Sequence, residues 1–446
     1  MNKLKVLSSL LTVLFALMPV AAFAQDTGPA LDSGDTAWML TSSLLVLMMS
    51  VPGLALFYGG LVKRNNVLAT LMQTVAVCAV VSLLWPVIGY SLVFTDGANL
   101  FVGGFDKLLL EGVTPLSTYK FAATIPESVF IMFQMTFAII TAALLLGSVA
   151  DRIKFSSVLV FVPLWMLAVY APVAHWVWGP GGFIGGVDAP DTAGMLGFGF
   201  ALDFAGGTVV HIASGVAGLV AALVLGRSYD FHDRTPSPAN IVMSLIGTGL
   251  LWVGWFGFNA GSALTAGTGA GMAMLVTNTS AAVACLAWIF AEWVHRGKPS
   301  VVGALSGVVS GLVAITPAAG FVGFGTSIVI GFAAGVVCFL ACTYLKKWLK
   351  YDDSLDVFGI HGIGGIVGCI LTGVFATKAI GPAAGLIEGN ANQLIAQLIS
   401  IVIVVAYVTV ITFILIKVVQ KVMGLRVPQI AEEEGLDMFL HGETYK

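Results

Sequence analysis

Apolar segments long enough to cross a membrane recur along most of this chain. A transmembrane helix needs about 20 consecutive apolar residues, and the sequence after residue 35 offers eleven such segments. Their approximate bounds are 36–61, 67–94, 122–149, 156–178, 204–225, 239–258, 271–294, 301–317, 325–345, 357–377 and 393–418. Only 10% of the 446 residues are charged, against about 25% in soluble domains. The sequence therefore predicts an all-α polytopic membrane protein with eleven transmembrane helices.

The basic residues predict how these helices are oriented. If the first helix starts outside the cell, fifteen of the eighteen Lys and Arg beyond residue 24 fall on the cytoplasmic side. Only Lys107, Lys120 and Lys378 fall outside. This bias follows the positive-inside rule and favours an N-out, C-in topology. The net charge of −3 gives no reason to expect nucleic acid as a partner.

The first 24 residues have the composition of a secretory signal peptide. Lys3 and Lys5 precede the apolar run "VLSSLLTVLFALMPV", and "AFA" at 22–24 fits a small-residue cleavage site. An uncleaved first helix is the alternative. We expect a cleaved segment at 1–24, a transmembrane domain at 25–419 and a cytoplasmic tail at 420–446.

Two of the predicted helices open with similar motifs. The fifth begins with Asp203, then glycines, then His211; the tenth begins with Asp356, then Gly359 and His361. Helices one to five and six to ten would have opposite orientations, because five is an odd number. This arithmetic indicates a 5+5 inverted repeat with one extra helix, and such repeats bind their cargo at the repeat interface.

Metal and cofactor sites are not expected. The five cysteines lie in apolar runs without zinc-type or disulfide-type spacing. The glycine-rich stretches "GPGGFIGG" at 179–186 and "GIGG" at 362–365 lack the βαβ context of a phosphate-binding loop.

His211 and His361 are the strongest candidates for a functional pair. Each lies inside an otherwise apolar segment, where an ionisable group is costly and indicates function. The alternative is a pair of buried histidines satisfied by backbone carbonyls. If the two meet, at most one carries a charge, because two imidazolium ions would repel. A neutral imidazole offers one donor and one acceptor, which suits ammonia, a proton or water and does not suit an anion.

Aromatic residues predict a cation site outside this pair. Phe133 and Phe137 lie one helical turn apart in "FQMTF", and Phe258 and Ser262 are equally spaced in "WFGFNAGS". Trp178 ends the fourth segment on the same side. Aromatic faces and a hydroxyl can hold a small cation by cation–π attraction and one hydrogen bond. A place in the interfacial aromatic belt is the alternative for Trp178.

Several longer motifs resemble the ammonium transporter (Amt/Mep/Rh) family, bacterial Amt branch: "PGLALFYGGLV", "DFAGGTVVHIASGVAGL", "WFGFNAGSA", "DVFGIHGIGGIVG" and the tail "GLRV…EEEGLD…HGE". The resemblance covers nearly the whole chain after the signal peptide. It implies a homotrimer of eleven-helix protomers in the bacterial inner membrane, surrounded by lipid. It also implies a tail that docks a PII-type signalling protein.

The resemblance also assigns roles to individual residues. It implies ammonium recruitment by Trp178, Phe133 and Ser262, with Asp203 stabilising the outer mouth. It further implies a phenyl gate of Phe137 and Phe258, and a pore lined by His211 and His361 with Trp255 beside it. The stretch between Trp178 and Asp203 is longer than in compact family members, so we expect a differently shaped outer vestibule. No enzyme is expected, because the histidines lack a nucleophile. A passive ammonia gas channel and an ammonium sensor remain alternatives, although sensors of this family tend to carry an appended domain that a tail of about 26 residues has no room for.

Overall fold

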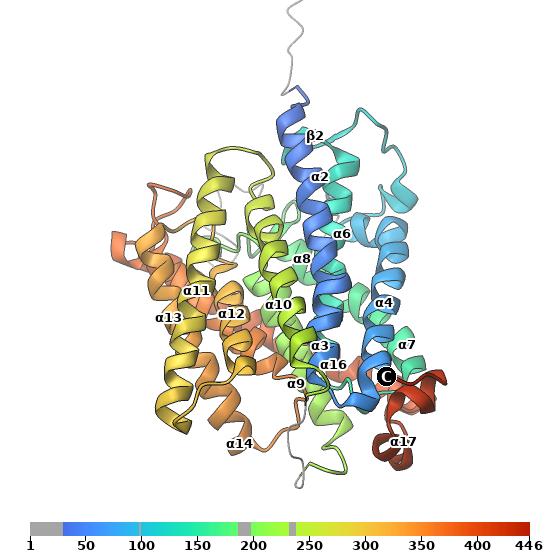
Figure 1. The fold of residues 1–446 in the computed structure, drawn as a ribbon. Helices are drawn as coiled ribbons and strands as arrows, with labels where there is room; N and C mark the ends of the chain where they lie inside the picture. Colours follow the sequence, from blue (N-terminus) through green and yellow to red (C-terminus); the bar gives the residue numbers. More distant parts are fainter. Residues whose placement is uncertain (1–29, 98–99, 186–197, 232–237) are drawn as a thin grey trace, which may run out of the picture.

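The computed structural model describes residues 30–97, 100–185, 198–231 and 238–446 (Figure 1). The predicted signal peptide at 1–24 lies outside the described residues, as does half of the long outer stretch that precedes Asp203.

The described chain is almost entirely helical, and its helices run side by side (Figure 1). Within the described residues, ten helical segments are long and apolar enough to cross a membrane. They are Ser33–Leu61, Arg64–Phe94, Glu127–Leu146, Phe155–Trp178, Gly207–Leu225, Ile241–Ala260, Thr268–Arg296, Phe324–Leu349, Phe358–Phe375 and Ala391–Met423. The apolar helix α12 (Val301–Ile315) is shorter and coincides with the eighth predicted segment. The protein is thus an all-α polytopic membrane protein.

One predicted helix begins later than its sequence indicated. The segment predicted at 122–149 starts as the short strand β2 (Ala122–Pro126), which pairs antiparallel with β1 (Thr118–Tyr119). Helix α6 (Glu127–Leu146) starts only after Pro126. A proline disfavours helical geometry in the residue before it, so the apolar run is split between a strand and a helix.

Small residues allow close packing between α11 (Thr268–Arg296), α12 and α13 (Phe324–Leu340). A Cβ atom on Gly311 would lie 2.4 Å from the carbonyl oxygen of Ser280, and one on Gly335 would lie 2.5 Å from that of Ala284. Only glycine lets the backbones approach this closely, as is common between membrane helices.

The C-terminal tail packs against the helix bundle at the end opposite β2 (Figure 1). Helix α16 (Ala391–Met423) extends three residues past the predicted start of the tail, and α17 (Gln429–Glu434) follows. The Asp437 carboxylate accepts a hydrogen bond from the Ala69 N–H at 2.8 Å, and Arg426 pairs with Glu432. The tail is thus anchored by hydrogen bonds to the first turn of α4 (Val67–Leu84).

Candidate transport pathway

The helix that carries His211 opens on a buried aspartate. Its first turns are the π-helical segment η6 (Gly207–Ile212), followed by α9 (Ala213–Leu225). The Asp203 carboxylate accepts hydrogen bonds from the backbone N–H groups of four residues at 2.6 to 3.2 Å. Gly206, one of the four, has a φ of 109°, a left-handed conformation that favours glycine. Asp203 therefore caps the positive end of this helix.

The helix that carries His361 opens in the same way on Asp353. The π-helical turn η9 (Phe358–Gly362) leads into α15 (Ile363–Phe375), and Asp353 accepts a hydrogen bond from the Phe358 N–H at 2.8 Å. Asp353 lies eight positions before His361, the spacing that separates Asp203 from His211. The counterpart of Asp203 is therefore Asp353 and not Asp356, which the sequence motif had indicated. Asp356 instead forms an ion pair with Lys346 at 2.7 Å.

The two histidines meet at the centre of the bundle. Their Nδ1 atoms lie 3.2 Å apart, so one nitrogen donates and the other accepts. The rings are inclined by 21°, and the two residues are 1% and 3% exposed. The indole of Trp255 stacks on His211 at 5.4 Å between centroids, and its Nε1–H donates to Thr316 at 2.9 Å.

A small apolar lumen surrounds the histidine pair. Its volume of about 10 Å³ suits a guest the size of one water molecule. Within the described residues, the buried Nε2 atom of His211 has no hydrogen-bond partner. Apart from the two imidazoles and the Trp255 ring, the lining side chains are aliphatic or phenyl: Met49, Leu54, Phe57, Ile140, Leu144, Leu251, Phe258 and Val309. The histidines are therefore the polar groups available to a small guest there.

Two phenyl rings separate this lumen from a larger outer cavity. Phe137 and Phe258 stack with 4.2 Å between centroids and an angle of 22°. Phe258 lines the inner lumen, whereas Phe137 lines the outer cavity. Both rings are buried, with exposed fractions of 1% for Phe137 and 0% for Phe258.

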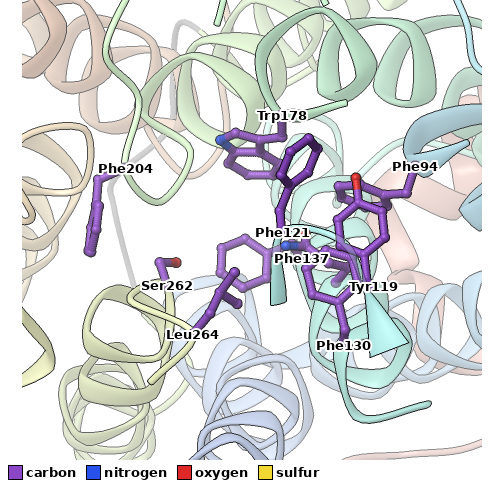
Figure 2. Close-up of a pocket in the computed structure, with 10 residues that line it drawn as sticks. Phe94, Tyr119, Phe121, Phe130, Phe137, Trp178, Phe204, Ser262 and Leu264 are labelled. Carbon is purple, nitrogen blue, oxygen red and sulfur yellow. The ribbon is translucent and has the colours of Figure 1, made fainter. Parts of the chain in front are cut away.

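The outer cavity is aromatic and measures about 150 Å³. Figure 2 shows Trp178 and Phe137 together with several further rings on one side, and Ser262 on the other. Phe133 does not line the cavity; it packs edge-on behind Phe137 at 5.0 Å. Lining residues that sequence reasoning missed are Phe94, Tyr119, Phe121, Phe130, Gln134, Phe204 and Leu264. Several come from the 119–121 region or the outer loops, and no helical spacing links them to the others.

Hydrogen bonds determine what the cavity offers to a guest. The Trp178 Nε1–H donates to the carbonyl oxygen of Asp203 at 3.0 Å, which holds the indole in place. The Ser262 hydroxyl donates to the Phe258 carbonyl at 2.8 Å, so its lone pairs can accept a hydrogen bond. A hydrogen-bond acceptor beside an aromatic face suits a small cation with N–H groups.

The two capping aspartates differ in their charged neighbours. Burial raises the pKa of Asp203, and the bonded backbone N–H groups oppose that rise. Burial also raises the pKa of Asp353, but there the ammonium of Lys346 is the main opposing influence. In the part of the chain that the structure describes, Asp203 forms no ion pair. The outer cap therefore leaves a carboxylate without a paired cation.

Comparison with known proteins identifies the family of this chain. The family model described as Ammonium Transporter Family matches residues 37–446. The chain belongs to this family. The ammonium transporter of Aquifex aeolicus is 48% identical over 424 residues, which cover 95% of this chain and 96% of the relative. The relatives are named as transporters, so this member of the family is a transporter and not an enzyme.

Solved structures agree with this assignment of fold. The crystal structure of Saccharomyces cerevisiae Mep2 matches with a TM-score of 0.80 at 34% identity, covering 89% of this chain and 88% of Mep2. A solved "Sensor Amt Protein" matches with a TM-score of 0.81 at 25% identity, covering 92% of this chain and 98% of that chain. The all-helical architecture is therefore shared with both.

Proposed function

We propose that this protein moves ammonium across the bacterial inner membrane, with net charge transfer, along the path from the outer cavity to the histidine pair. The observation that carries the proposal is the contact of His211 and His361 at 3.2 Å in an otherwise apolar lumen. Burying an ionisable pair in an apolar lumen is energetically costly, so its presence there indicates a function.

The first step is capture of the cation in the outer cavity. The faces of Trp178 and Phe137 attract ammonium, and Ser262 accepts one of its N–H groups. The unpaired carboxylate of Asp203 adds negative potential at this mouth. These contacts replace part of the cation's hydration shell before it reaches the phenyl pair.

The second step is separation of the proton. Bare ammonium in an apolar lumen is expensive, so an N–H bond breaks and the proton goes to His211 Nε2. The proton on His211 Nδ1 then moves to His361 Nδ1, and the proton on His361 Nε2 leaves toward the cytoplasm. Neutral ammonia crosses the lumen and takes up a proton on that side. Only one extra proton resides on the pair at a time. Potassium has no proton to give and is excluded.

Two alternatives differ in a measurable way. A passive gas channel would carry ammonia without current. A sensor would signal to partners, and a sensor structure is among the matches. Transport is favoured because the relative named as an ammonium transporter is 48% identical over nearly the whole chain, against 25% for the sensor.

The test is transport by the double variant His211→Ala/His361→Ala in proteoliposomes. We expect loss of the ammonium-specific current, gain of a potassium current, or both, since the polar relay is replaced by an open apolar lumen. His295→Ala is the matched control, because His295 bonds Tyr344 in an exposed position on α11. A double variant that still carries ammonium selectively and electrogenically contradicts the proposed mechanism.

We further propose that the protein forms a homotrimer surrounded by lipid. We also propose that each protomer has its N-terminus outside and its C-terminus in the cytoplasm, and that the signal peptide is cleaved. The packed tail supports a docking role for a PII-type signalling protein, because it presents folded backbone on that face. Native mass spectrometry of the purified protein tests the trimer and the mature N-terminus together; a monomer or an intact residue 1 contradicts the respective proposal.

A further inference from the structure

Helix α16 stands outside the predicted repeat, yet two of its glutamines reach the outer mouth. Gln393 and Gln397 lie one helical turn apart and are 5% and 0% exposed. Gln393 donates to the Phe200 carbonyl at 2.9 Å. Burying a primary amide is unfavourable unless its N–H and C=O groups form hydrogen bonds. The hydrogen-bond partners of Gln397 therefore account for a glutamine at this buried position.

The Gln397 amide has no unused donor. Its Oε1 accepts from the Leu202 N–H at 2.5 Å, and its Nε2 donates to the Leu202 carbonyl at 2.9 Å. The second Nε2 hydrogen goes to the Cys369 carbonyl on α15 at 3.1 Å. Rotating the amide by half a turn would lose these bonds, so its orientation is fixed.

These bonds join the two histidine-bearing helices. Leu202 directly precedes Asp203, which caps the helix of His211. Cys369 lies on the helix of His361, and its Sγ atom is 3.3 Å from the Thr208 hydroxyl. A single side chain of α16 therefore ties the opening of one pore helix to the body of the other.

The contact also determines where Trp178 lies. The Asp203 carbonyl accepts the Trp178 Nε1–H, and the position of that carbonyl follows from the position of Leu202. The approach of α16 is close: a Cβ atom on Gly373 would lie 2.8 Å from Cγ of Gln397. The amide is thus held tightly between its neighbours.

We propose that Gln397 is a positioning residue for cation capture, which acts by fixing Leu202 so that Asp203 and Trp178 present the cation site. This inference rests on the proposed function of the outer cavity. It predicts a specific kinetic change: the ammonium concentration for half-maximal current rises, whereas the maximal current, set deeper in the pore, changes little.

The experiment measures ammonium-jump currents in proteoliposomes of the full chain carrying Gln397→Met. We expect the half-saturating concentration to rise about tenfold, the change that corresponds to roughly one lost hydrogen bond. Thr412→Val is the matched control on the same helix: Thr412 is equally buried and accepts the Trp165 Nε1–H at 3.0 Å. That variant should lose comparable thermal stability without any change in half-saturation.

A second variant keeps the inference testable if Gln397→Met does not fold. A protonated glutamic acid at this position offers one acceptor and one of the two donors of the amide, whereas the carboxylate offers no donor to the two carbonyl oxygens that it faces. In Gln397→Glu we therefore expect half-saturation to approach the wild-type value as the outer pH is lowered. A half-saturation equal to wild type at every pH overturns the inference.

Trp178→Leu in the same assay separates this inference from the proposed function. If Trp178→Leu raises half-saturation and folded Gln397→Met does not, Gln397 has no positioning role and capture at Trp178 stands. If neither variant changes half-saturation, capture at the outer cavity is itself wrong, and the inference about Gln397 falls with it.

Discussion

The openings of the two histidine-bearing helices share their geometry and differ in their charge. At the outer opening Asp203 accepts four backbone N–H groups and has no ion-pair partner in the described residues. At the other opening Asp353 accepts one, and Lys346 donates to its carbonyl oxygen at 2.6 Å while also pairing with Asp356. In the described residues, the outer carboxylate therefore has no ammonium beside it, whereas at the other opening one ammonium, that of Lys346, lies beside the two carboxylates of Asp353 and Asp356.

Under the proposed function, this difference gives the pathway a direction for capture. In the proposed function, aromatic faces attract a cation that enters the outer cavity, and the buried carboxylate of Asp203 adds negative potential there. At the opposite end Lys346 offsets the carboxylates, so a departing cation is held less strongly. Outer variants should therefore change half-saturation, and inner variants should change the maximal rate.

Removing the aromatic face of the outer site should have the largest effect on half-saturation. Trp178→Leu loses a desolvated cation–π contact worth about 2 kcal/mol, so we expect half-saturating ammonium to rise about thirtyfold in proteoliposome currents. Phe121→Leu is the control on the same cavity, because Lys120 already lies 5.0 Å from the centre of that ring. Equal effects of the two variants would break the assignment of capture to Trp178.

Removing the hydroxyl should have a smaller effect at the same end. Ser262→Ala loses one acceptor for a cationic N–H group, worth about 1.5 kcal/mol, so half-saturation should rise about tenfold. Ser262→Thr keeps the acceptor and should restore the wild-type value. An unchanged half-saturation in Ser262→Ala would show that the hydroxyl serves only its bond to the Phe258 carbonyl.

The smallest effect is expected at the inner opening and should have a different form. Lys346→Met leaves Asp353 and Asp356 uncompensated, so the departing cation is retained and the maximal current falls about fivefold, as for a salt bridge of about 1 kcal/mol. Half-saturation measured from outside should not change. The exposed neighbour provides the control Lys347→Met. If Lys346→Met changed the half-saturating concentration and Lys347→Met did not, the proposed difference between the outer and inner openings would be wrong.

Helix positions and the central pair could be predicted from the sequence because both depend on local patterns. Apolar length predicted eleven helices, and within the described residues ten of these segments are long and apolar enough to cross a membrane. The isolation of His211 and His361 in apolar runs indicated a pair. The spacing of Phe258 and Ser262 placed them one turn apart, and the structure joins them by a hydrogen bond.

Other features depend on contacts between distant segments, which a single sequence does not encode locally. The sequence analysis matched Asp356 with Asp203 because Asp356 is the nearest aspartate before His361, five positions away. The equivalent residue is Asp353, which shares with Asp203 the spacing of eight positions before the histidine. Phe133 has the right helical spacing, yet it packs edge-on against Phe137 and is not among the residues that line the cavity. Nothing in the pattern of α16 linked Gln397 to Leu202.

The most direct test of this account is the current that follows an ammonium jump on proteoliposomes adsorbed to a solid-supported membrane, with potassium as the control. The account predicts a current specific to ammonium that is lost in Asp203→Ala, because net charge moves and the unpaired carboxylate draws the cation to the mouth. Rapid internal alkalinisation without any current would contradict it: neutral ammonia would then be the species that crosses, and the histidine pair would be a selectivity lining and not a proton path.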